Sequence, residues 1–279
     1  PGAVSERTGR VSSERPRRGT VERWCFDLIR TVELPSKLEP PPPPHEFEQD
    51  AAVRRLERPG SPRELRLVAR APRTPGTGAM VRPEVRARIL HSFLHHELQA
   101  AELMAWAVLA FPSSPQAFRR GLVGIALDEL RHIAMYRAHL EVLGFDVGDF
   151  PVRDWFWERV PTCADPLSFV SLMGLGFEGA NLEHARRFAA RFREAGDLPG
   201  AAIQERVAAE EVAHVRFAVH WFREFCGSEL EFQRWCESLP RPLSPLVLRG
   251  LPLAREARRS AGMPEPFLDA LESWAPSGS

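Results

Sequence analysis

One pattern of glutamate and histidine occurs twice along the chain, and its residue types suit a metal site. Each copy has a lone glutamate followed by a Glu-x-x-His motif: Glu97 with Glu129 and His132 in the first half, and Glu178 with Glu211 and His214 in the second. Carboxylate and neutral imidazole are suitable ligands for iron or manganese. Two helix pairs that each place a carboxylate opposite a Glu-x-x-His can hold two metal ions between them. The pattern therefore predicts a redox-active di-iron centre.

The doubling of the motif carries more weight than either copy. With 28 glutamates and nine histidines in 279 residues, about one Glu-x-x-His is expected by chance, so a single match predicts nothing. Here both motifs fall in the middle of expected helices, and in both copies the lone glutamate precedes its motif by almost the same distance. Six ionisable side chains on apolar helix faces are costly to bury unless cations compensate them. We expect a metal centre, with a buried hydrogen-bond network as the alternative.

Four long helices must position these side chains. Prolines at 83 and 115 suit first helical turns, with Ser113 or Ser114 as the cap of the second helix, and glycines at 144 and 227 suit helix ends. Short first and third connections favour antiparallel neighbours, whereas about twenty residues separate the second helix from the third. The sequence therefore predicts an all-α fold, a four-helix bundle with one long crossover. The expected helices are 83–110, 115–143, 166–196 and 200–227.

The rest of the chain is expected to lie outside this bundle. The predicted organisation is a disordered arm (1–20), a short helix followed by a Pro-rich extended segment (21–81), the bundle (82–227), and additional short helices (228–279) at 228–239, 242–250 and 264–274. Five consecutive prolines from Pro40 cannot join a helix, so the segment around them is extended. It is either a linker or a belt laid across the bundle, for which Leu65, Leu67 and Val68 offer anchors.

Composition limits the kinds of partner. Lys+Arg and Asp+Glu balance at 37 each, which disfavours nucleic acid and anionic membrane as partners. The longest apolar run, 103–111, is too short to span a bilayer, so no membrane is expected. The cysteines form no Cys-x-x-Cys pair and read as the reduced thiols of a cytoplasmic protein. Lys37 is the only lysine, and nothing local explains its place.

The sequence around the motifs resembles that of known di-iron proteins. The order Glu, Glu-x-x-His, Glu, Glu-x-x-His is similar to the ferritin-like, rubrerythrin-type di-iron carboxylate superfamily. A bacterial ferritin-like family of unknown function is closer still, over about residues 20–230 with the Pro-rich lead-in. The segments that carry this likeness are HHELQAAELM from His95, DELRH from Asp128 and FEGANL from Phe177.

The resemblance implies two iron ions, with a Mn/Fe pair left open, and assigns each ligand. It gives Glu97, Glu129 and His132 to one metal and Glu178, Glu211 and His214 to the other, with Glu129 and Glu211 as bridges. Two of these assignments have competitors, Glu102 for Glu97 and Glu183 for Glu178, each five residues later and about 140° away around its helix. Metal-bound histidines usually donate their other N–H to a carboxylate or carbonyl. Candidates for supporting contacts are Asp128, Asn181, Glu102, Glu183 and, with little to favour it over plain packing, Tyr136. Four other histidines, His95, His96, His184 and His220, are expected at helix surfaces or in local hydrogen bonds.

Three functions stay open on these grounds. We favour an oxidase or oxygenase that uses O2 or peroxide on a small organic substrate, and a homodimer is compatible with it. The second is a rubrerythrin-like peroxidase or ferroxidase. In both cases electrons must come from an external donor, because no cysteine-rich electron-transfer module is present in the sequence. The third is a metal-free helical binding module.

Overall fold

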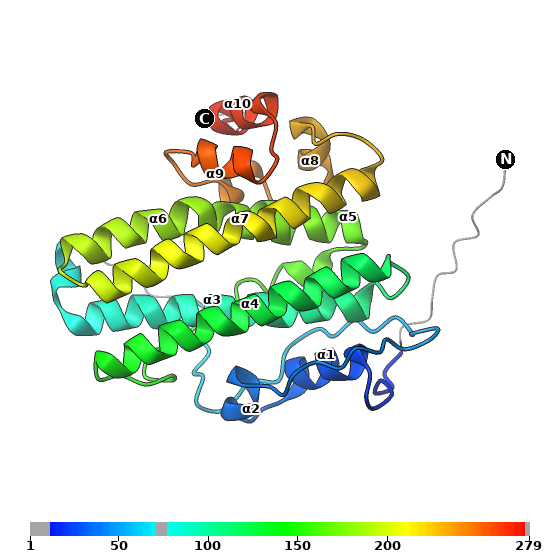
Figure 1. The fold of residues 1–279 in the computed structure, drawn as a ribbon, viewed down its shortest axis with the longest axis horizontal. Coiled ribbons are helices and arrows are strands. Elements are labelled where there is room, and N and C mark those ends of the chain that lie inside the picture. Colours follow the sequence, from blue (N-terminus) through cyan, green and yellow to red (C-terminus); the bar gives the residue numbers. More distant parts are fainter. Residues whose placement is uncertain (1–11, 71–76, 277–279) are drawn as a thin grey trace.

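Four long helical stretches form the centre of the molecule. The computed structural model describes residues 12–70 and 77–276, and within them the chain is helical, with one isolated bridge between Leu67 and Val152 in place of a sheet. This confirms the all-α expectation. The stretches are α3 (Pro83–Ala110), α4 (Gln116–Val142), the run of α5 (Pro166–Phe169), η3 (Val170–Glu178) and α6 (Gly179–Glu194), and α7 (Leu198–Cys226). In Figure 1, α3 packs along α4 and α6 along α7, and α4 contacts α7 between the pairs.

Local chemistry sets most of the helix ends. Helix α3 begins at Pro83 and ends at Ala110, as predicted. The third stretch opens with a capping box, in which the Asp165 side chain accepts from the Ser168 N–H. Gly227 ends α7 with a φ of 67°, in the left-handed region that favours glycine. The second helix differs from its prediction because Pro115 itself occupies the cap position, so neither serine before it caps the helix.

The third stretch is not a regular α-helix. Its segment η3 is a π-helix that ends at Glu178, where the sequence predicted an unbroken α-helix. The Gly179 N–H donates to the carbonyl of Gly174, five residues back. A Cβ built on Gly174 would lie 2.4 Å from the Ala218 Cβ on α7, so only glycine lets the wide turn approach α7 this closely. π-helical turns occur frequently at functional sites.

The Pro-rich segment lies against the helices as a belt. Helix α1 (Val21–Arg30) packs on α3, and α2 (Leu34–Leu38), which was not predicted, contacts α4. The Trp106 indole donates to the Leu56 carbonyl at 3.0 Å, and the Arg54 N–H donates to the Leu109 carbonyl at 2.9 Å. The arm expected to be disordered over 1–20 is described from Ser12, whose N–H donates to the Val53 carbonyl. Residues 1–11 lie outside the described part of the chain.

Short helices cover the opposite face. They are α8 (Phe232–Ser238), η4 (Pro245–Leu248), α9 (Arg255–Ser260) and α10 (Glu265–Ser273). Figure 1 shows α9 over α6 and α7, on the far side of the molecule from α1. The helix predicted at 242–250 is only a short 3-10 turn, and α9 was not predicted. No helix in the described residues has the length and apolar character needed to cross a membrane.

Candidate metal centre

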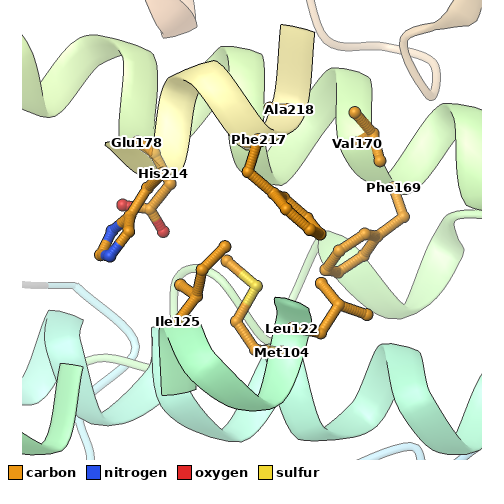
Figure 2. A pocket seen from close by; sticks show the side chains of 10 residues that line it. Met104, Leu122, Ile125, Phe169, Val170, Glu178, His214, Phe217 and Ala218 are labelled. Carbon is orange, nitrogen blue, oxygen red and sulfur yellow. The ribbon is translucent and has the colours of Figure 1, made fainter. Parts of the chain in front are cut away.

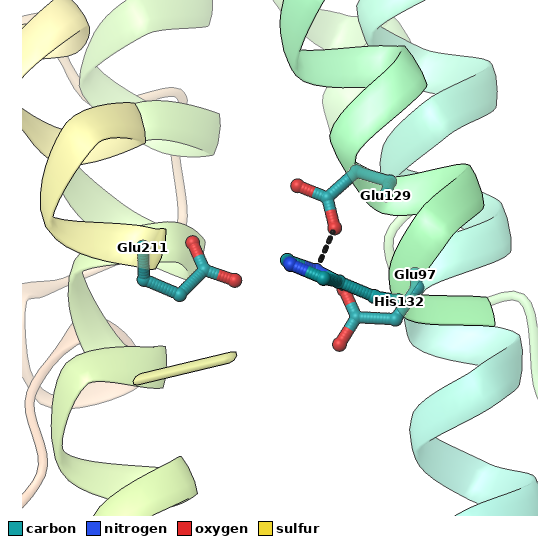
Figure 3. Close-up of side chains that lie close together, drawn as sticks. All are labelled: Glu97, Glu129, His132 and Glu211. Atoms are coloured by element: carbon teal, nitrogen blue, oxygen red, sulfur yellow. Dashed lines mark hydrogen bonds and ion pairs between the residues drawn. The ribbon is translucent and has the colours of Figure 1, made fainter. Parts of the chain in front are cut away.

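The six predicted ligands converge at one place. They form two groups whose candidate ligand atoms all lie within 4.8 Å of one another: Glu97, Glu129, His132 and Glu211 in the first, and Glu129, Glu178, Glu211 and His214 in the second. All six residues are buried. Figure 3 shows Glu211 on α7 approaching the first group from across the interface between the helix pairs. Glu129 and Glu211 belong to both groups, which is the arrangement that two bridging carboxylates require.

Both histidines present Nδ1 to the shared carboxylates. The Nδ1 atom of His132 lies 3.1 Å from Oε2 of Glu129, one turn earlier on α4. The Nδ1 atom of His214 lies 3.1 Å from Oε2 of Glu211 and equally far from Oε1 of Glu129. Residues three apart project from the same side of a helix. The Glu-x-x-His spacing therefore brings each imidazole and its carboxylate to the same point.

The outer ring nitrogens are held by carboxylates on the opposite helix. The Nε2 atom of His132 on α4 lies 3.0 Å from Oε2 of Glu210 on α7. The Nε2 atom of His214 on α7 lies 3.2 Å from Oδ2 of Asp128 on α4. Arg131 bonds to both of these carboxylates and joins the two halves. Such partners fix the orientation of a metal-binding imidazole.

Asp128 was among the predicted supporting residues, but Glu210 was not. Glu210 precedes Glu211 and points away from the face that Glu211 uses, which made it a poor candidate on its own helix. Its partner is His132 on the neighbouring helix, so only the packing of α4 on α7 shows its place. The one available signal is that each motif glutamate is preceded by an acidic residue, Asp128 before Glu129 and Glu210 before Glu211.

Charge in the centre is only partly compensated by the protein. Burial and the neighbouring Glu129 raise the pKa of Glu97 well above its usual value, and burial and Glu211 do the same for the pKa of Glu178. Burial alone would lower the pKa of His132, but hydrogen bonds and charge from Glu129 and Glu97 raise it to about 11. The buried Oε1 atom of Glu178 has no hydrogen-bond partner among the described residues. Buried carboxylate oxygens without donors, beside two imidazole nitrogens, fit divalent cations of the iron and manganese class.

The two competing glutamates lie away from the centre. Glu102 forms a buried ion pair with Lys37 of α2 and accepts from the Trp157 indole at 2.7 Å. Glu183 accepts two hydrogen bonds of 2.8 Å from the buried guanidinium of Arg258 in α9. Each competitor therefore anchors a flanking segment to the central helices. The ion pair with Glu102 also accounts for Lys37, the only lysine of the chain.

Two further candidates lie near the centre in different ways. The Asn181 side-chain N–H donates to Oε1 of Glu211 at 2.9 Å, which supports a shared carboxylate directly. Tyr136 is buried, and its hydroxyl accepts from the Gln204 side-chain N–H at 3.0 Å. Burial and the charge of Glu97 raise the pKa of Tyr136 well above its usual value. Among the described residues, the hydrogen bond of the Tyr136 hydroxyl is with Gln204 and not with a candidate ligand.

A cavity of about 240 Å³ lies on the side of the centre formed by α3, η3 and α6. Glu97 and Glu178 line it, whereas His132 and His214 do not. His96 and His184, expected at helix surfaces or in local hydrogen bonds, also line it. The remaining wall residues come from the same three elements and from the crossover: Phe93, Ala100, Trp155, Phe156, Phe177, Ala180 and Asn181.

A second cavity is much smaller and almost wholly apolar. Its volume of about 10 Å³ is at the lower limit of what can hold one water molecule. Figure 2 shows Glu178 and His214 at one end of it and Phe169 and Val170 at the other. The centre therefore borders one roomy cavity and one narrow apolar cavity.

Comparison with known proteins places the chain in a family. An uncharacterized protein of Haemophilus influenzae is 23% identical over 192 residues, which cover 66% of this chain and 66% of that protein. The chain thus spans just under two thirds of that relative's length. No solved structure matches the chain. The model of a family described as "Protein of unknown function (DUF455)" matches residues 19–269, which include the whole centre, and the chain belongs to that family.

Proposed function

We propose that this protein is a ferritin-like di-iron enzyme that uses O2 or peroxide to oxidise a small organic molecule. The observation that carries the proposal is the pair of overlapping ligand groups that share Glu129 and Glu211, next to a cavity large enough for a substrate. The helix arrangement supports it. Two helix pairs joined by the long connection from Leu143 to Asp165 are what a ferritin-like four-helix bundle with one crossover would require.

Each side chain has a distinct task in this proposal. Glu97 and His132 would bind one ion, Glu178 and His214 would bind the other, and the two shared carboxylates would bind both. The outer carboxylates Asp128 and Glu210 hold the imidazoles in the orientation that presents Nδ1 to the metals. Iron is the first choice and a Mn/Fe pair the second, because the same O and N ligands suit both metals.

When bound, reduced iron supplies the electrons that O2 or peroxide takes up. The protein's own part is to exclude water and to admit the substrate on one side only. Apolar side chains such as Met104, Ile125 and Phe217 lie beside Glu178 and His214 and keep bulk water out of that end. The described residues form no further cluster that could hold a metal, so we expect a separate electron donor.

Metal analysis joined to oxygen uptake tests the proposal. The full chain is loaded with Fe(II) without oxygen, desalted, and analysed for iron and by Mössbauer spectroscopy. We expect two irons per chain, one for each ligand group, and oxygen uptake that increases with a small-molecule cell extract. Rapid turnover of hydrogen peroxide or Fe(II) without any organic compound would favour a rubrerythrin-like peroxidase or ferroxidase. A chain that binds no iron would be a metal-free binding module, and the proposal would be wrong.

A further inference from the structure

We propose that the cavity beside Glu97 and Glu178 binds a flat, uncharged aromatic molecule, the size of naphthalene, that carries a hydroxyl or N–H group. As a substrate assignment this rests on the proposed function, but the binding itself does not require turnover.

Aromatic rings line much of the cavity. Phe156 stacks on Phe177 with ring centres 4.6 Å apart and planes 17° apart. His96 stacks on Phe156 at 5.2 Å and 22°, so Phe156 is stacked on two neighbouring rings. Phe93 and Trp155 add further aromatic surface. Aromatic rings prefer offset stacking or edge-to-face contact with other rings, which favours a planar aromatic ligand over a flexible aliphatic one.

The charges around the cavity disfavour an ionic ligand. Among the described residues no arginine or lysine lines it, and the carboxylates in its wall are Glu97 and Glu178. Arg159 lies over the Trp155 ring, but its guanidinium is bonded to the Trp155 carbonyl and to Glu158. Two divalent ions and the four glutamates of the centre sum to zero formal charge, so a ligand carboxylate would enter without a net counter-ion, and leaving a buried charge unpaired is costly. A neutral ligand avoids this cost.

Two imidazoles offer hydrogen bonds at the cavity wall. Among the residues that the structure describes, neither His96 nor His184 has a hydrogen-bond partner, and both are partly exposed. Burial and the nearby Arg187 lower the pKa of His184, which keeps its ring uncharged at neutral pH. A neutral imidazole can donate from one nitrogen and accept at the other. A hydroxyl or N–H on the ligand would satisfy one of these rings.

Shape-matched probes that differ in charge test the inference. Isothermal titration of the metal-loaded full chain would compare 2-naphthol with 2-naphthoate and 2-naphthylmethylammonium. We expect 2-naphthol to bind at least about tenfold more tightly than either ion, which corresponds to about 1.4 kcal/mol. Equal or tighter binding of either ion would overturn the assignment.

Two cavity variants and one control variant test whether the probe binds in the cavity. We expect His184→Leu to weaken naphthol binding about five- to tenfold through loss of a hydrogen bond, and Phe156→Leu to weaken it similarly through loss of aromatic contact in the wall. His220→Leu, an exposed histidine on α7, is the matched control and should bind as the wild type does. If both cavity variants bind naphthol like this control, the cavity is not the site and the inference is wrong.

Two readouts keep this inference separate from the proposed function. Metal content is measured in every sample, and ligand-observed NMR saturation transfer reports naphthol binding to the wild type without any variant. Naphthol binding by a chain that takes up no iron would preserve the cavity assignment and remove the di-iron proposal. Iron uptake with no naphthol binding would do the reverse.

Discussion

The two sides of the candidate centre differ in what lies behind the metal-facing atoms. Behind His132 and His214, the packed helices α4 and α7 supply a polar layer of Glu210, Asp128 and Arg131. Behind Glu97 and Glu178 lies a cavity of about 240 Å³ with aromatic walls. One side is tied down by hydrogen bonds across the helix pair, and the other has room for a molecule.

One side would hold the metal ions in place, and the other would give a substrate access to them. An imidazole fixed at its outer nitrogen keeps its ligand nitrogen in place, which suits the side that sets metal geometry. Carboxylates that border a cavity can face a substrate while the opposite side stays closed.

Removing a shared carboxylate should affect both metal ions, whereas removing an unshared one should affect one. Dividing about 10–16 kcal/mol for a four-ligand site among its ligands gives about 3 kcal/mol per ligand and ion. Glu211→Gln should therefore lose about 6 kcal/mol of metal binding summed over two ions, and Glu97→Gln about half of that. Anaerobic iron titration with elemental analysis measures this. Glu224→Gln, at an exposed position on α7, is the control. Two irons bound by Glu211→Gln at wild-type affinity would contradict the shared arrangement.

The paired glutamates of α3 should separate stability from metal binding. Glu102→Gln leaves the buried Lys37 ammonium without its counter-ion, which should cost about 3–5 kcal/mol of unfolding free energy while iron content stays unchanged. Urea unfolding and iron analysis measure the two properties. The double change Lys37→Met with Glu102→Leu should recover much of the stability, because it removes both buried charges. A stable Glu102→Gln protein that has lost iron would place Glu102, and not Glu97, in the centre.

The outer carboxylates Asp128 and Glu210 should matter for metal affinity, and His184 of the cavity wall, which is not a candidate ligand, should not. Glu210→Ala and Asp128→Ala each remove the partner of one imidazole, and such changes typically weaken metal binding about 10- to 100-fold. His184→Leu changes the cavity side and should leave iron affinity as it is. Competition with a chelator of known affinity measures all three. Equal losses of iron affinity in all three variants would contradict the view that one side holds the metals and the other admits the substrate.

The contribution of His91 to folding stability should depend on pH in the opposite direction to that of His132. His91 is buried, and its Nε2 accepts the Gly148 N–H at 2.8 Å, so it is held uncharged. Burial and the charge of His95 lower its pKa to about 4. The stability it contributes is present above its unfolded pKa of about 6.5 and is lost as pH falls towards 4.

The measurement is the unfolding free energy of metal-free wild type and His91→Gln between pH 4 and 7. The wild type should lose up to about 1.4 kcal/mol more per pH unit than the variant, since one extra proton binds on unfolding. Metal-free protein is used so that the other ionisable groups of the centre contribute alike to both. Parallel pH curves would show that His91 is not held neutral.

Periodicity and capping residues allowed much of the scaffold and the inner ligands to be predicted. Helix α3 begins and ends at the predicted residues because Pro83 and Pro112 bracket an unbroken helix-forming run. Glu97 and Glu178 could be preferred over Glu102 and Glu183 because they share a helix face with apolar neighbours. The lone glutamates and the Glu-x-x-His motifs are local patterns, and local patterns survive in a single sequence.

Contacts between distant helices could not be predicted in this way. Glu210 meets His132 across 78 residues of sequence, and Arg258 meets Glu183 across 75. No local pattern encodes such pairs, because they depend on how the helices pack. The π-helical turn at Gly174 depends in the same way on the approach of Ala218. The cavity is even harder to predict from the sequence, because its walls come from four separate elements.

Anomalous X-ray diffraction at the iron edge, from crystals of the Fe(II)-loaded chain, would locate the proposed metal ions. We expect two strong peaks, one contacted by Glu97 and His132, the other by Glu178 and His214, with Glu129 and Glu211 in contact with both. A single peak, peaks elsewhere in the molecule, or no peak in a chain shown to be folded would contradict this expectation.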